Sequence, residues 1–298
     1  MSMRHLLVVT GIVVTASCAP ASGSWSPRLI CHNSNCVEPP RPEEDDTVES
    51  LEASLALRSD DGTPLLDGVE IDTFWFGAES RCLFAHDLEN ASRLPARTAA
   101  EMVRDHLRDL RREARPLSRS RGPFVLFVEL KGHVGPAKSE LHDEGQRTAH
   151  ADCALEILDT LAGPAQQEGL PVEITFTSFV PVLLSEVQSR LAARGWQDSD
   201  NVVVRTGAIL GLPTPLDSQN HTLEEFDAST GISMVTAHPH WISLGQRQAF
   251  ASRGLALGYW MFSAVPETYA ALERDQPRYV TTNEAHALWR WLAQRELP

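Results

Sequence analysis

The chain has 298 residues, of which 42% are hydrophobic and 22% are charged, so it can form one large α/β domain or two small ones. Its formal net charge of −14 argues against nucleic-acid binding and against adhesion to anionic lipid through a basic surface, because both depend on Lys and Arg. A protein that gathers carboxylates around a metal ion is compatible with this charge.

The N-terminal residues have the character of a targeting segment. Residues 6–16 form an apolar run that is too short to span a bilayer as a stable helix. The four residues that end at Cys18 resemble a bacterial lipobox, which would place lipid on Cys18 after cleavage. Residues 19–21 offer an ordinary signal-peptidase site as the alternative. The sequence predicts a signal peptide at residues 1–18 and export to the bacterial cell envelope, in the periplasm or on the outer surface.

A short tether at residues 19–27 and one domain at residues 28–298 are expected to follow. Export would put the later cysteines in an oxidising compartment, where disulfides form. These cysteines allow three pairings, and spacing does not choose among them. A bond between Cys31 and Cys36 would pin the loop between them, and Cys82 is a further candidate. Cys153 lies in a helical pattern, where a cysteine is more often a buried free thiol.

Strand and helix patterns alternate along the domain. Apolar runs typical of strands lie at residues 28–35, 66–87, 123–131, 172–179, 201–210, 232–237, 255–262 and 278–282. Helical patterns lie at residues 46–57, 98–115, 144–161, 181–194, 223–228, 244–252, 266–273 and 284–296. Strands that are each followed by a helix predict an α/β fold, the (β/α)8 TIM barrel, whose sites lie at the carboxyl ends of the strands. An open doubly wound sheet is the alternative, and no Gly-rich phosphate loop follows the first strand to support it.

Charged residues stand near the ends of the first strands. Glu70 and Asp72 are two residues apart, so both carboxylates share one side of the strand. Glu129 and Lys131 repeat this spacing in the next apolar strand. Two like charges about 4 Å apart repel by roughly 4 kcal/mol at an effective dielectric of about 20, and Lys131 alone does not offset three carboxylates. Lys131 could stabilise a phosphate oxygen in a transition state, or else be a buried counter-ion of Glu129.

A divalent cation would supply the missing positive charge. Carboxylate oxygens and an Asn side-chain oxygen suit Mg²⁺ or Ca²⁺ better than Zn²⁺. The sequence therefore predicts one such ion, held by Glu70, Asp72, Glu129 and Asn33. Protonation of one carboxylate is the metal-free alternative.

Two histidines flank these carboxylates. His32 closes the first strand, and His86 follows the apolar run at residues 82–85 and precedes Asp87. Two histidines beside a metal can act as general base and general acid, and a structural role is the alternative for each. His238 and Trp260 are weaker candidates for substrate contact at the ends of later strands. A polar loop and a core position are their respective alternatives.

These residues resemble the PLC-like phosphodiesterase superfamily, and its glycerophosphodiester phosphodiesterases best. The motifs are His32-Asn33, Glu70-x-Asp72, His86-Asp87 and Glu129-x-Lys131, with similar landmarks at Thr177-Ser178-Phe179, Tyr259-Trp260 and Thr281-Thr282-Asn283. The resemblance covers about residues 30–291 and implies a (β/α)8 barrel. It also implies residue roles: His32 and His86 as the acid–base pair, Lys131 on the phosphate, and the cation on Glu70, Asp72 and Glu129.

Two positions depart from the glycerophosphodiesterase pattern. That family has Arg-Gly after its first His, where this chain has Asn33-Ser34, and an Asp in the last strand, where this chain has Asn283. His-Asn at the first position resembles instead the phosphoinositide-specific phospholipases C, in which the Asn is a metal ligand. The departures bear on the substrate more than on the chemistry.

The sequence thus predicts a metal-dependent phosphoric diester hydrolase that acts on glycerophosphodiesters or phospholipid head groups. The alternatives are a phosphoinositide-type phospholipase C, a sphingomyelinase D-like lyase, and a non-catalytic surface lipoprotein that binds a lipid head group on the same barrel. The expected partners are a small-molecule or lipid phosphodiester and, through lipid on Cys18, a membrane. No nucleic acid is expected, and the protein is expected to be a monomer.

Overall fold

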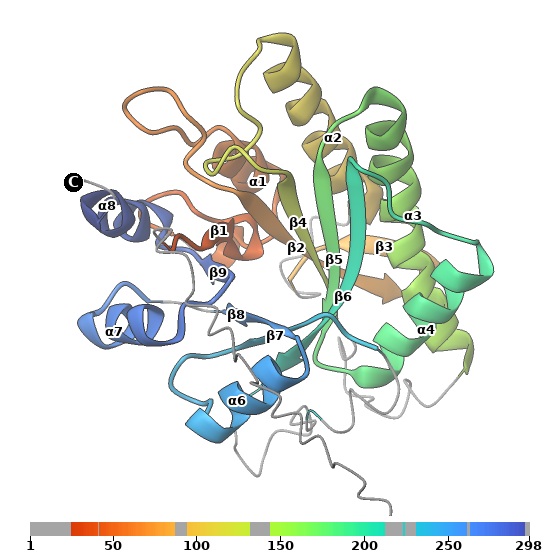
Figure 1. The fold of residues 1–298 in the computed structure, drawn as a ribbon. Coiled ribbons are helices and arrows are strands. Elements are labelled where there is room, and N and C mark those ends of the chain that lie inside the picture. Colours follow the sequence, from red (N-terminus) through yellow and green to blue (C-terminus); the bar gives the residue numbers. More distant parts are fainter. Residues whose placement is uncertain are drawn as a thin grey trace, which may run out of the picture.

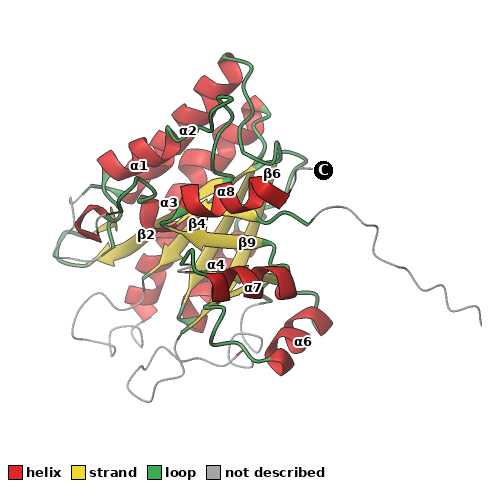
Figure 2. Ribbon diagram, turned by 90° about the vertical axis from the view of Figure 1, so that its left-hand side faces the viewer, coloured by secondary structure: helices red, strands yellow, loops and turns green. Residues whose placement is uncertain are grey.

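The computed structural model describes residues 25–40, 42–86, 94–131, 144–211, 223, 231–260 and 263–295. Eight parallel strands form a closed barrel with helices on its outside (Figures 1 and 2). The strands are β1 (Arg28–Cys31), β2 (Gly68–Phe76), β4 (Phe124–Leu130), β5 (Val172–Ser178), β6 (Val202–Leu210), β7 (Met234–Ala237), β8 (Ala256–Tyr259) and β9 (Tyr279–Thr282). Because β1 pairs with both β2 and β9, the predicted TIM barrel is confirmed and the open doubly wound sheet is wrong.

Most described helices follow the strands as predicted, with ends shifted by at most three residues, but the helix predicted at residues 144–161 extends to Glu168. The described helices are α1 (Val48–Leu55), α2 (Ala96–Arg112), α3 (Glu144–Glu168), α4 (Pro181–Ala193), α6 (Leu244–Ser252), α7 (Pro266–Asp275) and α8 (Ala285–Arg295). Local chemistry sets several starts: Thr47 and Ser243 form capping boxes, and Pro181 and Pro266 occupy first helical positions. Of the helix predicted at residues 223–228, only Leu223 belongs to the described residues. None of the described helices combines the length and apolar character needed to cross a membrane.

The inward side of β2 and β4 changes character along the strands. Gly68 pairs with Val125, Glu70 with Phe127, and Asp72 with Glu129, and such register partners point to the same side of a sheet. Val125 and Phe127 join an apolar cluster inside the barrel. A Cβ at Gly68 would lie 1.9 Å from the Val125 carbonyl oxygen, so only glycine fits there. The inward side of β2 and β4 is therefore apolar at the amino end of the barrel and acidic at the carboxyl end.

Two segments differ from the predicted strands. β1 ends at Cys31, and the residues that follow form the 3₁₀ turn η1 (His32–Ser34), with Asn33 and Ser34 at positive φ of 47° and 56°. The strand predicted at residues 28–35 was therefore too long. The stretch at residues 66–87 folds back on itself: β3 (Arg81–Phe84) pairs antiparallel with β2 and is not one of the parallel barrel strands.

Two disulfides lie within the described residues. Cys31 is bonded to Cys36, which closes the loop that carries His32 and Asn33. Cys82 in β3 is bonded to Cys153 in α3. The expectation that Cys153 is a free thiol is therefore wrong, because the hairpin brings Cys82 against the helix. Cys18 and the rest of the predicted signal peptide lie outside the described residues, so export and lipidation stay predictions.

Candidate active site

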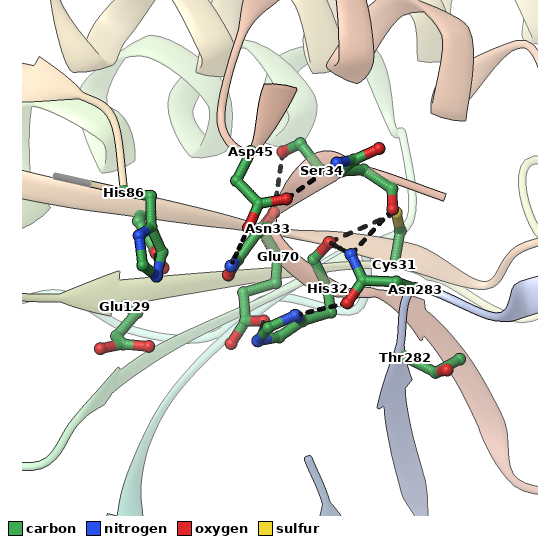
Figure 3. Close-up of polar contacts among 12 residues, drawn as sticks. Cys31, His32, Asn33, Ser34, Asp45, Glu70, His86, Glu129, Thr282 and Asn283 are labelled. Atoms are coloured by element: carbon green, nitrogen blue, oxygen red, sulfur yellow. Dashed lines mark hydrogen bonds and ion pairs between the residues drawn. The ribbon is translucent and has the colours of Figure 1, made fainter. Parts of the chain in front are cut away.

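Strand register brings the first carboxylates together at the carboxyl end of the barrel. Asp72 and Glu129 are direct partners across the β2–β4 pair. Cys31 is the partner of Val69 across the β1–β2 pair, so the next residues, His32 and Glu70, are neighbours (Figure 3). All three carboxylate residues are at most 5% exposed. The structure thus places the acidic candidates in one buried group.

Lys131 lies in the middle of this group as a counter-ion. Its Nζ is 2.9 Å from Asp72 Oδ2 and 3.0 Å from Glu129 Oε1. Burial lowers the pKa of Lys131, but the charges of Asp72 and Glu129 outweigh burial and hold this pKa above its usual value. In the protein without ligands, Lys131 is therefore a buried counter-ion of Asp72 and Glu129. Its contact with a phosphate remains a prediction.

A fourth carboxylate, Asp46, was missed by the sequence analysis as a site residue. Thr47 caps α1, and Asp46 turns inward, with 1% of its surface exposed. Asp46 Oδ1 accepts a hydrogen bond of 3.1 Å from the backbone N–H of Asp72. The only sequence signal was its place in an acidic run before a helix, which by itself is typical of a solvated loop.

The carboxylates repel one another when no further cation is bound. Burial, followed by the charge of Asp72, raises the pKa values of Asp46 and Glu70 well above their ordinary values. Burial also raises the pKa of Glu129 to about 7, against the opposing charge of Lys131. One lysine therefore does not balance the negative charge of the group.

Several buried oxygens of this group have no hydrogen-bond partner. They are Asn33 Oδ1, Asp46 Oδ2, Glu70 Oε2 and Asp72 Oδ1. Such oxygens are rare in protein interiors and suit a hard cation such as Mg²⁺ or Ca²⁺. As the side chains stand, no group of three or more His, Cys, Asp or Glu residues in the described part of the chain is gathered tightly enough to hold a metal ion. The donor chemistry therefore fits a cation, whereas the arrangement is that of a lysine-bridged, metal-free site.

Asn33 is held so that its side-chain oxygen stays available. Its Nδ2 donates to Asp45 Oδ2 at 3.1 Å, and its backbone N–H donates to the Glu70 carboxylate. Its carbonyl accepts from the backbone N–H of Asp46 at 2.8 Å. The amide orientation follows from the Asp45 contact, because only the nitrogen can donate to a carboxylate.

His32 is oriented by Asn283, at the end of β9. Asn283 Nδ2 donates to the carbonyls of His32 and Asn35 at 3.2 and 2.8 Å, which turns Oδ1 toward His32 Nδ1, 2.8 Å away (Figure 3). His32 Nδ1 therefore carries the proton, and Nε2, 3.8 Å from Glu70 Oε2, keeps its lone pair. Burial lowers the pKa of His32, so the ring is neutral near pH 7 and can accept a proton. In the sequence, Asn283 was identified as part of a landmark and as a departure from a motif, but not as a partner of His32.

The β2–β3 hairpin places His86 on the other side of the group. The backbone N–H of Ala85 donates to the Asp72 carbonyl at 3.2 Å, and His86 Nε2 then lies 3.9 Å from Asp72 Oδ2. The His86 side chain is 40% exposed, so it borders solvent. Asp87 lies outside the described residues. His32 and His86 therefore flank the carboxylates from opposite sides, as an acid–base pair requires.

Comparison with solved structures finds the same barrel in phosphodiesterases. A glycerophosphodiester phosphodiesterase from Parabacteroides distasonis has a TM-score of 0.55 at 15% identity, covering 92% of this chain and 99% of that one. One from Agrobacterium tumefaciens has a TM-score of 0.52 at 13% identity, covering 89% and 100%. A phosphodiesterase from Oleispira antarctica, in complex with the product sn-glycerol-3-phosphate, has a TM-score of 0.53 at 12% identity, covering 90% and 97%. No protein-family profile and no curated protein matches the chain.

The fold is that of the glycerophosphodiester phosphodiesterases. The resemblance that the sequence motifs indicated is confirmed at the level of the barrel. At these identities the likeness concerns the fold, and the chemistry rests on the residues of the site.

His238 and Trp260 lie on the far half of the barrel mouth from the carboxylates. They follow β7 and β8, and their contacts within the described chain are aromatic or with backbone. His238 stacks on Trp241 with ring centroids 4.2 Å apart, while Trp260 meets Trp241 and Phe179 edge to face. Trp260 Nε1 donates to the carbonyl of Leu210 at 3.3 Å. The structure brings these two candidates together with each other but not with the acidic group.

Proposed function

We propose that the protein is a metal-dependent phosphodiesterase that hydrolyses glycerophosphodiesters or phospholipid head groups. The observation that carries the proposal is a neutral, oriented His32 beside buried carboxylates whose charge one lysine does not balance. A dication and a phosphodiester together would complete such a site. The relative from Oleispira antarctica, which binds sn-glycerol-3-phosphate on the same fold, is consistent with this substrate class.

Oxygens of Asn33, Glu70, Asp72 and Glu129 are proposed to hold one Mg²⁺ or Ca²⁺ ion. The buried oxygens without partners support this donor set. When bound, the ion supplies Lewis-acid polarisation of a phosphoryl oxygen and a template that orients the phosphate. In the absence of substrate, Lys131 contacts Asp72 and Glu129. We propose that its ammonium group forms an ion pair with a phosphate oxygen when substrate is bound.

The two histidines divide the proton transfers. His32 Nε2 takes the proton of the nucleophile, a water or a neighbouring hydroxyl of the substrate, because Asn283 fixes the proton on Nδ1. His86, at the solvent border, gives a proton to the leaving alkoxide as the phosphorus–oxygen bond breaks. With water as nucleophile, the products are a phosphomonoester and an alcohol.

A second product class has its own support in Asn33. This residue stands where glycerophosphodiesterases have arginine, and its buried Oδ1 has no partner. An amide oxygen at that place favours the phosphoinositide-type reaction, in which a substrate hydroxyl attacks the phosphorus and a cyclic phosphodiester forms. Phosphorus NMR of the products distinguishes this outcome, and that of a sphingomyelinase D-like lyase, from hydrolysis to a monoester.

The direct test is hydrolysis by the domain from residue 24 onward. The substrates are glycerophosphocholine, glycerophosphoinositol, phosphatidylinositol and sphingomyelin, each with Mg²⁺, with Ca²⁺ and with chelator. Metal-dependent turnover of one of them is expected, with a loss of at least ~100-fold in Glu70→Gln and no change in the exposed control Glu52→Gln. Undiminished activity of folded Glu70→Gln would contradict the proposal. If none of the substrates is hydrolysed and the protein binds no cation, a non-catalytic scaffold that binds a head group is favoured.

Export and lipidation belong to the same proposal. Mass spectrometry of the full chain expressed in bacteria would show a diacylglyceryl adduct and cleavage before Cys18. Cleavage after residue 21 with no lipid would instead indicate free secretion.

A further inference from the structure

We infer that Asp46 is a further carboxylate ligand of the cation site, contributing Oδ2 beside the oxygens of Asp72 and Asn33. The inference rests on the proposed function, because it concerns the same cation. No motif pointed to Asp46, and its position follows from the path of the loop between η1 and α1.

The local backbone frees the Asp46 side chain from capping α1. Thr47 Oγ1 accepts from the Ser50 backbone N–H at 3.2 Å, so the first turn of α1 is already capped. Asp46 itself has a φ of 53°, in the left-handed region. This conformation is sparsely populated by non-glycine residues, and aspartate is among those that adopt it most readily. It aims the carboxylate into the barrel mouth, where only 1% of the residue is exposed.

Direct hydrogen bonds join Asp46 to Asn33 and to Asp72, the two neighbouring candidate ligands. Its backbone N–H donates to the Asn33 carbonyl at 2.8 Å, and its Oδ1 accepts from the Asp72 backbone N–H at 3.1 Å. Its second oxygen, Oδ2, is buried without a partner, as are Asn33 Oδ1 and Asp72 Oδ1. Three segments of the chain thus each carry a buried oxygen that accepts no hydrogen bond. Hydrogen bonds link Asp46 to the other two residues, Asn33 and Asp72.

The charges point to a cation rather than to a further donor. Lys131 forms ion pairs with Asp72 and Glu129, and no basic side chain among the described residues forms an ion pair with Asp46. An ion that takes Asp46 Oδ2 as a ligand would therefore bring positive charge to a carboxylate with which Lys131 forms no ion pair. Four carboxylates and an amide also approach the oxygen-rich coordination that Ca²⁺ prefers.

The competing explanation is that Asp46 only positions Asp72 through the backbone hydrogen bond. Asp46→Asn separates the two, since an amide oxygen can still accept from the Asp72 N–H but carries no charge, and asparagine tolerates positive φ. Asp46→Ala removes both functions. Asp60→Asn, in an exposed turn, is the matched control for the loss of one negative charge.

The experiment measures the melting temperature of each folded variant against increasing Ca²⁺ or Mg²⁺, with chelator as the zero point. We expect both Asp46→Asn and Asp46→Ala to need at least ~10-fold more cation for the same shift, and Asp60→Asn to match the wild type. Asp46→Ser is a second neutral variant should Asp46→Asn not fold. A wild-type response in Asp46→Asn, with weakening confined to Asp46→Ala, would overturn the inference and leave a positioning role. Absence of any response in the wild type would instead overturn the proposed cation itself.

Discussion

The barrel buries carboxylates at both of its ends, but it treats them in opposite ways. At the amino end, Asp67 accepts hydrogen bonds from the backbone N–H groups of Leu29 and Ser120, at 2.9 and 2.7 Å, and pairs with Arg28 and Arg119. At the carboxyl end, Lys131 is the one lysine or arginine within the described residues that pairs with Asp72 and Glu129, and His86 lies 3.9 Å from Asp72.

Glu173 in β5 repeats the pattern of the amino end. It is 4% exposed, accepts a hydrogen bond from the Tyr279 hydroxyl at 2.5 Å, and lies within 3.6 Å of Arg205 and 3.5 Å of Arg278. The same chain can thus provide full sets of partners for buried carboxylates. Among the described residues, the lack of partners at the carboxyl end is therefore a local property of the candidate site, and it supports the proposed cation site.

The largest expected effect is on turnover at the carboxyl end. His32→Gln should lower kcat by about 10²- to 10⁴-fold, because it removes a positioned general base. The melting temperature should change little, since His32 lies at the rim of the group. Steady-state kinetics and thermal unfolding of the same preparation test both parts, and a variant with unchanged kcat would remove His32 from the mechanism.

At the amino end, the same kind of change should affect stability and leave catalysis alone. Asp67→Asn leaves two arginines and two backbone donors without their carboxylate, so the free energy of unfolding should fall by about 3 kcal/mol. Denaturant unfolding measures this loss. If Asp67→Asn left the free energy of unfolding unchanged, the fully paired carboxylate at the amino end would not stabilise the fold. The contrast between the two ends would then be wrong.

A buried polar group in a helix outside the barrel should show only a stability effect. His150 in α3 is 7% exposed, its Nδ1 has no hydrogen-bond partner, and burial lowers its pKa to about 4. Between pH 6.5 and 4 the unfolded chain binds this proton and the folded one does not, so stability is fully present above pH 6.5 and is lost as the pH falls. The loss should reach about 3 kcal/mol at pH 4. His150→Leu should flatten this part of the stability curve, and the exposed control His240→Gln should not.

The smallest expected effect has the opposite sign from the one at Asp67. In chelator at pH 8, Glu70→Gln should raise the free energy of unfolding by about 1 kcal/mol, because it removes one member of a repelling group and keeps an acceptor for the Asn33 N–H. Denaturant unfolding without metal checks this. A lower free energy of unfolding in Glu70→Gln would show that contacts within the protein stabilise the Glu70 carboxylate, which would contradict the proposed repulsion.

The barrel and part of the site could be predicted because their patterns are local. β4 is a nearly continuous apolar run, and the spacing of Glu70 to Asp72 and of Glu129 to Lys131 places each pair on one face of a strand. Register across the β2–β4 pair then completes the acidic group.

The remaining features depend on the path of the chain in space. Asp46 reaches the group through a left-handed residue in a loop, and Asn283 reaches His32 because β9 closes the barrel onto β1. The second apolar run at residues 82–85 is visible in the sequence, but no spacing shows that it returns antiparallel to β2, which places His86 and joins Cys82 to Cys153.

The central claim, that the carboxyl end of the barrel binds one dication, is tested most directly by calorimetric titration of the wild-type domain. Ca²⁺ and Mg²⁺ are titrated at pH 7 in two buffers that differ in their heat of ionisation, which reports the protons released on binding. Because the pKa values of Asp46, Glu70 and Glu129 are raised in the metal-free protein, we expect one ion to bind with release of protons. A folded protein that binds neither ion would contradict the account.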